Sequence, residues 1–159
     1  MARLRPKGVL LTQYTITEVD GSDPAIAAEL HRFNGLAPDT FPPLEPRHLE
    51  NGYWWIISTG TKHVGFAGLV PFDPFPNVGF LKRCWIDPDA RGHGLHVRSI
   101  FTRETRAREL KWSMLVGECD ARNLASVYSH QRAGFAQIEP EQKWGSNYAN
   151  AIYWAKTLA

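Results

Sequence analysis

The chain has 159 residues, of which 43% are hydrophobic and 12% aromatic, so it suits one domain with a substantial buried core. Its 18 Lys and Arg residues nearly balance 16 Asp and Glu residues, and the net charge of +2 disfavours nucleic-acid binding. No run of about 18 or more apolar residues is present, so the sequence predicts no membrane-spanning helix and no membrane partner.

Residues 1–12 form a basic N-terminal extension. The apolar run within it, residues 8–11, is shorter than the core of a secretory signal peptide. Cys84 and Cys119 lie far apart and lack the spacing of a zinc site or a disulfide framework. We therefore expect a single cytoplasmic domain over residues 1–159 without a bound metal.

The first half of the chain predicts a strand, two helices and a three-strand meander. Apolar alternation marks the strands, a glycine turn at residues 60–62 joins two of them, and Asp87-Pro88 ends the last. The predicted elements are a strand at residues 14–19, a helix from Asp23 to about residue 35, a short helix at 45–51, and strands at 53–58, 63–70 and 78–86.

The second half alternates helices and strands. Val97, Ile100 and Leu110 recur at helical spacing, and Gly134 is the usual residue at a left-handed helix cap. The predicted elements are a helix of about four turns from residue 97, a strand at 113–119, a helix at 123–133, and closing strands at 135–138 and 149–154. This order predicts a mixed α/β sheet with helices on both faces.

A glycine-rich turn, Arg91-Gly92-His93-Gly94-Leu95-His96, connects the third meander strand to the long helix. Glycines let successive backbone N–H groups approach a ligand, and the positive end of the helix dipole favours an anion such as phosphate. The turn lacks the GKS/T ending of a Walker loop and is not a GxGxxG after a first strand. Taken alone, it is explained equally well as a tight strand-to-helix connection.

A second motif lies in the helix predicted at residues 123–133. Asn123-Leu124-Ala125-Ser126, followed by His130 and Gly134-Phe135, is similar to the N-x-x-A/S…Y/H…G-F helix of the GNAT superfamily of N-acetyltransferases. The glycine turn resembles the R/Q-x-x-G-x-G/A segment of that family, and residues 81–88 resemble its fourth strand. The resemblance implies an α/β (α+β) fold with a mixed, mostly antiparallel twisted sheet of about seven strands flanked by helices on both faces.

The same resemblance implies acetyl-CoA as cosubstrate, with its pantetheine arm between the fourth and fifth strands. The residues expected to bind it are Trp85, Ile86, Arg91, Gly92, His93, Gly94, Leu95, His96, Asn123 and Ser126. Arg98 and Arg103 are expected to reach the phosphates of the nucleotide. His96 departs from the family pattern, because Gly or Ala is usual there and a side chain narrows the approach to the amides.

N-acylation requires a deprotonated amine, a polarised thioester carbonyl and a proton for the departing thiolate. Glu118 resembles the general base of ribosomal-protein N-terminal acetyltransferases, although a solvated or cap-bonded carboxylate explains it equally well. His130, seven residues after Asn123 on the same helical face, is the expected general acid, and Tyr128 is the alternative donor.

By the same resemblance, residues 35–47 and 139–150 would contact the acceptor. Phe41, Asp39, Trp144 and Tyr148 would give an aromatic, mildly acidic mouth that suits an amine with an apolar body. The acceptor would be a small-molecule amine or a peptide N-terminus, and the sequence leaves a homodimer open.

The sequence thus predicts an N-acetyltransferase that moves an acetyl group from acetyl-CoA to a primary amine by direct transfer. One alternative is a non-catalytic acyl-CoA-binding sensor or interaction domain, which would need neither Glu118 nor His130. Another is a toxin-type acetyltransferase of aminoacyl-tRNA, which would need a basic face. The only candidate for such a face is the helix with Arg98, Arg103, Arg106, Arg108 and Lys111.

Overall fold

The computed structural model describes residues 4–5, 9–10, 13–37, 41–144 and 148–158. Its main sheet has seven strands in the order β3-β4-β5-β6-β7-β9-β8. The elements are β3 (Thr15–Val19), α1 (Pro24–Leu36), α2 (Pro46–Asn51), β4 (Tyr53–Thr59), β5 (Lys62–Pro71), β6 (Val78–Ile86), the 3₁₀ turn η1 (Pro88–Ala90), α3 (Leu95–Glu109), β7 (Met114–Asp120), α4 (Leu124–Arg132), β8 (Ala136–Ile138) and β9 (Ala151–Thr157).

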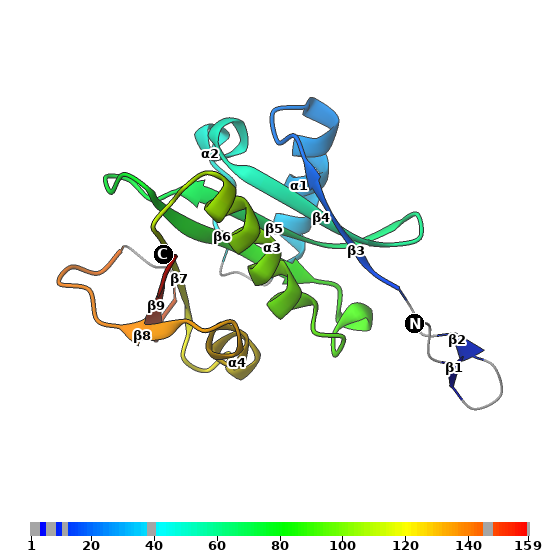
Figure 1. Ribbon diagram of the computed structural model, residues 1–159. Coiled ribbons are helices and arrows are strands. Elements are labelled where there is room, and N and C mark those ends of the chain that lie inside the picture. The colour runs from blue at the N-terminus through cyan, green and yellow to red at the C-terminus, as the bar shows by residue number, and fades with distance from the viewer. Residues whose placement is uncertain (1–3, 6–8, 11–12, 38–40, 145–147, 159) are drawn as a thin grey trace.

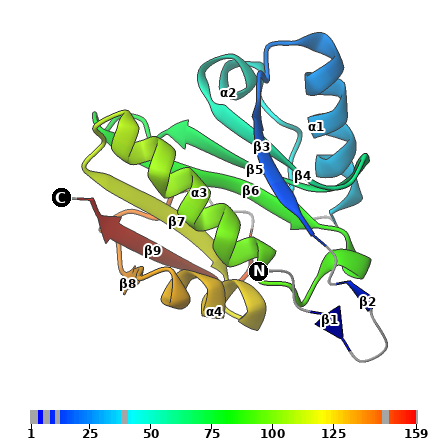
Figure 2. The same cartoon turned by 45° about the vertical axis from the view of Figure 1, so that its right-hand side comes forward.

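The sheet is covered on both faces, with α1 and α2 on one side and α3 and α4 on the other (Figures 1 and 2). All of its strand pairs are antiparallel except β6 with β7. The predicted fold class is therefore confirmed. Within the N-terminal extension, β1 (Leu4–Arg5) pairs antiparallel with β2 (Val9–Leu10), and the remaining residues up to 12 lie outside the described ranges.

Helix ends follow the signals in the sequence. The Asp23 side chain accepts hydrogen bonds from the amides of Ala25 and Ile26 at the start of α1, and Gly134 adopts a φ of +88° after α4. The bounds predicted for the last strand, residues 149–154, were wrong: β9 begins at Ala151 and extends to Thr157. It pairs with β7 along that strand's full length, and this long-range pairing overrides the polar character of Lys156 and Thr157.

Two neighbouring tryptophans on β4 show how the sheet separates two apolar cores. Trp54 packs with Leu30 and Phe33 beneath α1, whereas Trp55 packs with Ile100 beneath α3. Both rings are buried, since successive strand residues point to opposite faces and both faces are covered.

The parallel pair β6–β7 is short and then opens. Val78, Gly79 and Phe80 pair with β7, and the residues that follow in β6 do not. On its other side β6 carries a β-bulge, because Ala67 of β5 pairs with Cys84 while Gly68 pairs with Lys82. Arg83 is the extra residue, and its φ of +59° is left-handed, which is uncommon for a residue with a side chain. The bulge turns the end of β6 away from β7.

Arg103 of α3 holds this bulge from beneath. Its side chain is almost fully buried, and Nη1 donates to the carbonyl oxygens of Gly68 at 3.0 Å and Arg83 at 3.2 Å. Its Nε and Nη2 donate to the carbonyl and hydroxyl of Ser99. The expectation that Arg103 reaches nucleotide phosphates was wrong: its guanidinium points into the protein, where it satisfies carbonyl groups that the irregular ladder leaves open.

We predict that Arg103→Met lowers the free energy of unfolding by about 2–5 kcal/mol, because it leaves two buried carbonyl groups without donors. Urea unfolding would measure the loss. Arg106→Met is the matched control on the same helix; Arg106 forms surface ion pairs, so its loss should cost less than about 1 kcal/mol. Equal small losses in both variants would contradict this role of Arg103.

Candidate functional site

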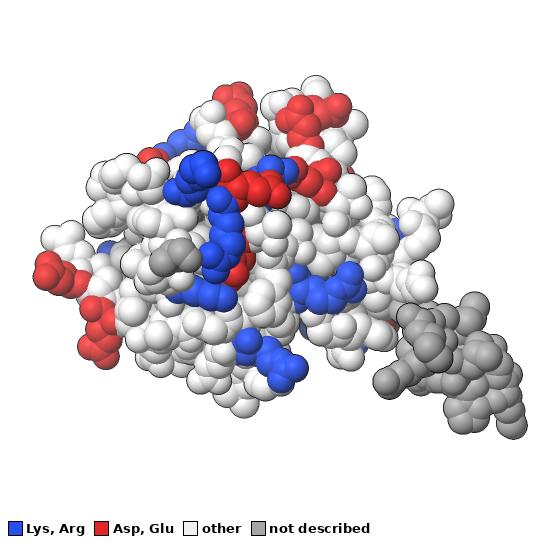
Figure 3. Space-filling model, in the orientation of Figure 1, with Lys and Arg blue, Asp and Glu red and all other residues white. Residues whose placement is uncertain are grey.

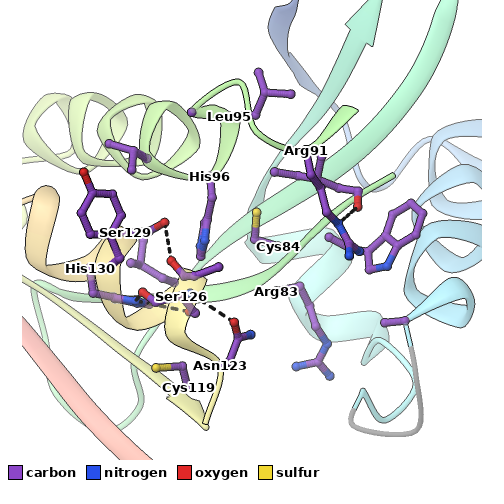
Figure 4. A pocket seen from close by; sticks show the side chains of 18 of the residues that line it. Arg83, Cys84, Arg91, Leu95, His96, Cys119, Asn123, Ser126, Ser129 and His130 are labelled. Atoms are coloured by element: carbon purple, nitrogen blue, oxygen red, sulfur yellow. Dashed lines mark hydrogen bonds between the residues drawn. The ribbon is translucent and has the colours of Figure 1, made fainter. Parts of the chain in front are cut away.

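A cavity of about 670 Å³ lies where β6 and β7 diverge. Its volume is in the range of small-molecule sites. One wall comes from the end of β6 and the glycine turn, and another from α4; Ala37, Phe41 and Tyr148 close one end. Figure 4 shows Cys84 of β6, His96 of α3 and Ser126 of α4 around the same space. The sheet irregularity therefore creates the cavity.

The glycine turn forms one edge of the cavity. Gly92 and Gly94 have φ angles of +82° and +70°, and a Cβ at either position would meet no protein atom within 4 Å. Gly94 is the N-cap of α3 and supplies no side-chain cap. The first amides of a helix have no partner within it, so those of α3 are available to an anion in the cavity.

Most of the predicted turn residues line this cavity. Arg91, Gly92, Gly94, Leu95 and His96 do so, as do Trp85 and Ile86 of β6. His93 is not among the lining residues: its ring packs on Tyr14 and its Nδ1 lies 3.0 Å from the Ala90 carbonyl oxygen.

Side chains of the turn also have structural contacts. Arg91 Nε donates to the carbonyl oxygen of Ile86 at 2.9 Å, which ties the turn to the end of β6. Arg98, which was expected near the phosphates, is exposed and donates to the carbonyl oxygen of Tyr14. These two hydrogen bonds hold the first turn of α3 and the segment before it against β6 and Tyr14.

Asn123 and Ser126 begin α4 beside the cavity. The Asn123 Oδ1 accepts a hydrogen bond from the Ser126 amide at 3.2 Å, so this side chain caps the helix. Both residues line the cavity. The cap uses the Asn123 oxygen and leaves the amide nitrogen of the same side chain as the donor for a ligand.

His130 is a buried, neutral imidazole. Its Nδ1 lies 2.7 Å from the Ser126 carbonyl oxygen, and since a carbonyl only accepts, Nδ1 carries the proton. The ring stacks on Trp154 at 5.3 Å, and its Nε2 is 3.1 Å from where a Cβ on Gly117 would lie. The pKa of His130 is lowered to about 4, mainly by burial and to a smaller extent by the positive charge of Arg103, while the hydrogen bond to Ser126 opposes the shift.

His96 stands edge-on to His130 with ring centroids 5.9 Å apart. Figure 4 shows its ring pointing from α3 into the cavity, so the side chain does not lie across the glycine turn. Burial lowers its pKa to about 3, with Arg103 and His130 adding to the effect. The two histidines on the α3 and α4 side of the cavity are therefore polar but uncharged at neutral pH, and the buried Arg103 of α3 is the cation in this wall.

The other two predicted catalytic residues occupy different places. Tyr128 is exposed on α4 and lines the cavity. Glu118 is half-buried on β7 and is not among the lining residues. Burial, followed by the negative charge of Glu118, raises the pKa of Tyr148, a cavity-lining residue, to about 12.

Arg83 is the site residue that sequence reasoning missed. Its side chain lines the cavity beside Phe41, and its Cζ lies 4.9 Å from the centre of the Phe41 ring. The available signal was the pair Lys82-Arg83, which interrupts an apolar strand and marks a bulge. Of the predicted mouth, Trp144 packs instead with Phe80 and Tyr153, and Asp39 lies outside the described residues.

Across the described residues, no three His, Cys, Asp or Glu side chains are placed to hold a metal ion. Over the same residues, no helix has the length and hydrophobicity needed to cross a membrane.

Comparison with known proteins agrees with this geometry. The model of the acetyltransferase (GNAT) family matches residues 24–135. No curated protein matches the sequence. Among solved structures, a ribosomal-protein-alanine N-acetyltransferase of Brucella melitensis is 26% identical with a TM-score of 0.68, over 91% of this chain and 99% of that one.

Two further structures share the fold at lower identity. A GNAT-family acetyltransferase of Staphylococcus aureus is 16% identical, with a TM-score of 0.70 over 91% of this chain and 100% of that one. YncA of Salmonella typhimurium, solved with its cofactor acetyl-CoA, is 18% identical, with a TM-score of 0.66 over 92% and 94%.

The neutral histidines His96 and His130 predict a pH dependence of stability. Their pKa values lie below the usual 6.5, so between about pH 6.5 and 4 the unfolded chain binds protons that the folded chain does not. The contribution of these histidines to the free energy of unfolding is therefore fully present above pH 6.5. It decreases on acidification, by up to ~1.4 kcal/mol per pH unit for each histidine. Urea unfolding at several pH values should show a shallower fall for His130→Phe; an identical slope would contradict the buried neutral state.

Proposed function

The chain belongs to the GNAT acetyltransferase family, and from this premise we propose that it transfers an acetyl group from acetyl-CoA to a primary amine by direct transfer. The observation that carries the proposal is the cavity between β6 and β7, one edge of which is a turn of open backbone amides. Acetyl-CoA would supply the activated acetyl group as a thioester.

The residues present fit this cosubstrate. The turn at Gly92 and Gly94 offers amides and space for a pyrophosphate, since neither position meets protein atoms where a Cβ would stand. The end of β6 does not pair with β7, and Trp85 and Ile86 there line the cavity, where the backbone on the β7 side would meet the pantetheine arm. The Asn123 side chain would bind that arm, and the acetyl-CoA bound in YncA supports the choice of ligand.

The reaction moves two protons. The ammonium of the acceptor loses one proton, and its nitrogen attacks the thioester carbonyl carbon; a C–N bond forms as the C–S bond breaks. The nitrogen then gives up a second proton, and the thiolate takes one to become the thiol, so one proton is released overall. Glu118 is the proposed base, because its negative charge acts on Arg83 and Tyr148, which line the cavity together with Phe41; this part of the cavity is the proposed acceptor end.

Tyr128 is the better of the two proposed proton donors. The single ring proton of neutral His130 is held by the Ser126 carbonyl, and its low pKa keeps the imidazolium scarce at neutral pH. Tyr128 lines the cavity and carries a hydroxyl proton. Burial also raises the pKa of the Cys84 thiol, which disfavours a covalent route through that residue.

The tRNA-directed alternative finds no support in the exposed face of α3. Arg106 pairs with Glu18 and Glu109, and Arg108 pairs with Glu104. Figure 3 shows Lys and Arg side chains interspersed with acidic ones over this face. A surface of mixed sign lacks the continuous positive field that nucleic-acid binding requires.

Gly92→Ala should weaken acetyl-CoA binding about 10-fold or more, because the new methyl group occupies the space above the turn. Isothermal titration calorimetry would measure the dissociation constant of acetyl-CoA for each variant. Gly60→Ala is the matched control: Gly60 also has a positive φ with open space around it, but it lies in the β4–β5 turn. Both variants should lose about 1 kcal/mol of stability. Equal affinities in both would show that the turn does not contact the ligand.

Thiol release from acetyl-CoA in the presence of an amine library tests the activity itself. Glu118→Gln should lower kcat/KM by about 10²–10⁴-fold, as expected for loss of a general base. Glu109→Gln, an exposed carboxylate on α3, is the control and should retain activity. Tyr128→Phe should lower kcat more than His130→Phe. Release of no thiol with any amine by a protein that binds acetyl-CoA would favour the non-catalytic sensor.

A further inference from the structure

Arg83 is a half-buried cation at the acceptor end of the cavity. Its Nε donates to Asn34 Oδ1 at 3.0 Å, and its Nη2 donates to the Pro42 carbonyl oxygen at 3.1 Å. These contacts and the Phe41 ring fix the guanidinium plane. Arg83 forms no ion pair with any carboxylate of the described residues, and several of its five N–H groups have no acceptor among them.

The backbone of Arg83 is also fixed by its surroundings. Its left-handed conformation is costly for a residue with a Cβ, and such conformations persist where the surroundings determine them and often where function needs them. Arg103 binds the Arg83 carbonyl from below, and Asn34 of α1 binds its side chain from the opposite face. The guanidinium is therefore pre-organised, which lowers the entropic cost of binding an anion.

The charges around the guanidinium point to a ligand with two charges. Burial lowers the pKa of Arg83, so the cation is partly desolvated, and an anionic partner would stabilise it. Glu118 and Tyr148 lie near enough to influence Arg83, yet Glu118 is outside ion-pair distance of it. A ligand that carries an amine for acetylation and a carboxylate for Arg83 would stabilise this cation.

We propose that the acceptor is a free amino acid whose carboxylate binds Arg83 and whose amine is deprotonated by the proposed base Glu118. The inference rests on the proposed acetyl transfer and narrows it to one substrate class. A peptide N-terminus or a simple alkylamine has no carboxylate beside the amine and would leave the Arg83 cation uncompensated. Phe41 and Ala37 at the same end of the cavity favour an apolar side chain.

The reaction then follows the proposed transfer with all atoms accounted for. The amino acid enters as a zwitterion, loses a proton from its ammonium group to Glu118, and attacks the thioester carbonyl carbon. The products are the N-acetyl amino acid, which keeps its carboxylate on Arg83, the free thiol of coenzyme A, and one proton released to solvent.

The test uses acceptors that differ only in the anionic group: L-phenylalanine, L-phenylalaninamide and phenethylamine, with L-leucine and L-leucinamide as a second series. Thiol release should give a kcat/KM at least about 10- to 100-fold higher for each amino acid than for its neutral counterparts, since a charge-assisted hydrogen bond is lost. Calorimetric titration of the same compounds into the protein saturated with coenzyme A measures the preference without turnover.

Variants of Arg83 assign the preference to its guanidinium. Arg83→Gln should raise KM for the amino acids and abolish their advantage over the amides, and Arg83→Lys should restore part of it. Lys82→Gln is the matched control, because Lys82 has the same charge and neighbours Arg83 but is not among the cavity-lining residues. Acetyl-CoA binding and thermal unfolding identify variants that are misfolded.

The outcomes separate this inference from the activity. Equal use of amino acids, amides and amines by the unmodified protein would overturn the assignment of the acceptor while leaving acetyl transfer intact. An amino-acid preference that survives Arg83→Gln would overturn the role of Arg83. If no acceptor releases thiol, the proposed transfer fails, and the titration with coenzyme A still decides whether the carboxylate is recognised.

Discussion

The parting of β6 from β7 is the constraint on which the rest of the site depends. These parallel strands pair over three residues and then separate, because the bulge at Arg83 redirects β6 and Arg103 fixes the bulge with its buried guanidinium. One arginine thus exposes the backbone of β6 to a cavity. The other faces the acceptor end of that same cavity.

Charge is distributed unevenly along the cavity. The wall formed by α3 and α4 holds two neutral histidines, whose low pKa values follow from burial and from the charge of Arg103. The proposed acceptor end is lined by Arg83 and Tyr148, and the negative charge of Glu118 acts on both. The neutral histidines are compatible with the proposed thioester, whereas the charges at the other end suit the proposed zwitterionic acceptor.

Most of the fold could be predicted from local patterns, because strand alternation, the Asp23 cap and Gly134 act within a few residues. The glycine turn at residues 91–96 and the helix motif that begins at Asn123 likewise marked residues that line one cavity. The role of Arg83 could not be predicted, since a bulge depends on the register with β5. Arg103 was mistaken for a surface cation, although it lies on the apolar side of α3 between Ile100 and Ala107.

A structure of the protein with bound coenzyme A tests the central claim most directly. The account predicts the pyrophosphate on the amides of residues 92–96 and the pantetheine arm between β6 and β7, with its thiol pointing toward the end of the cavity that holds Arg83. Coenzyme A bound elsewhere, or β6 and β7 closed together over their full length in the complex, would contradict it.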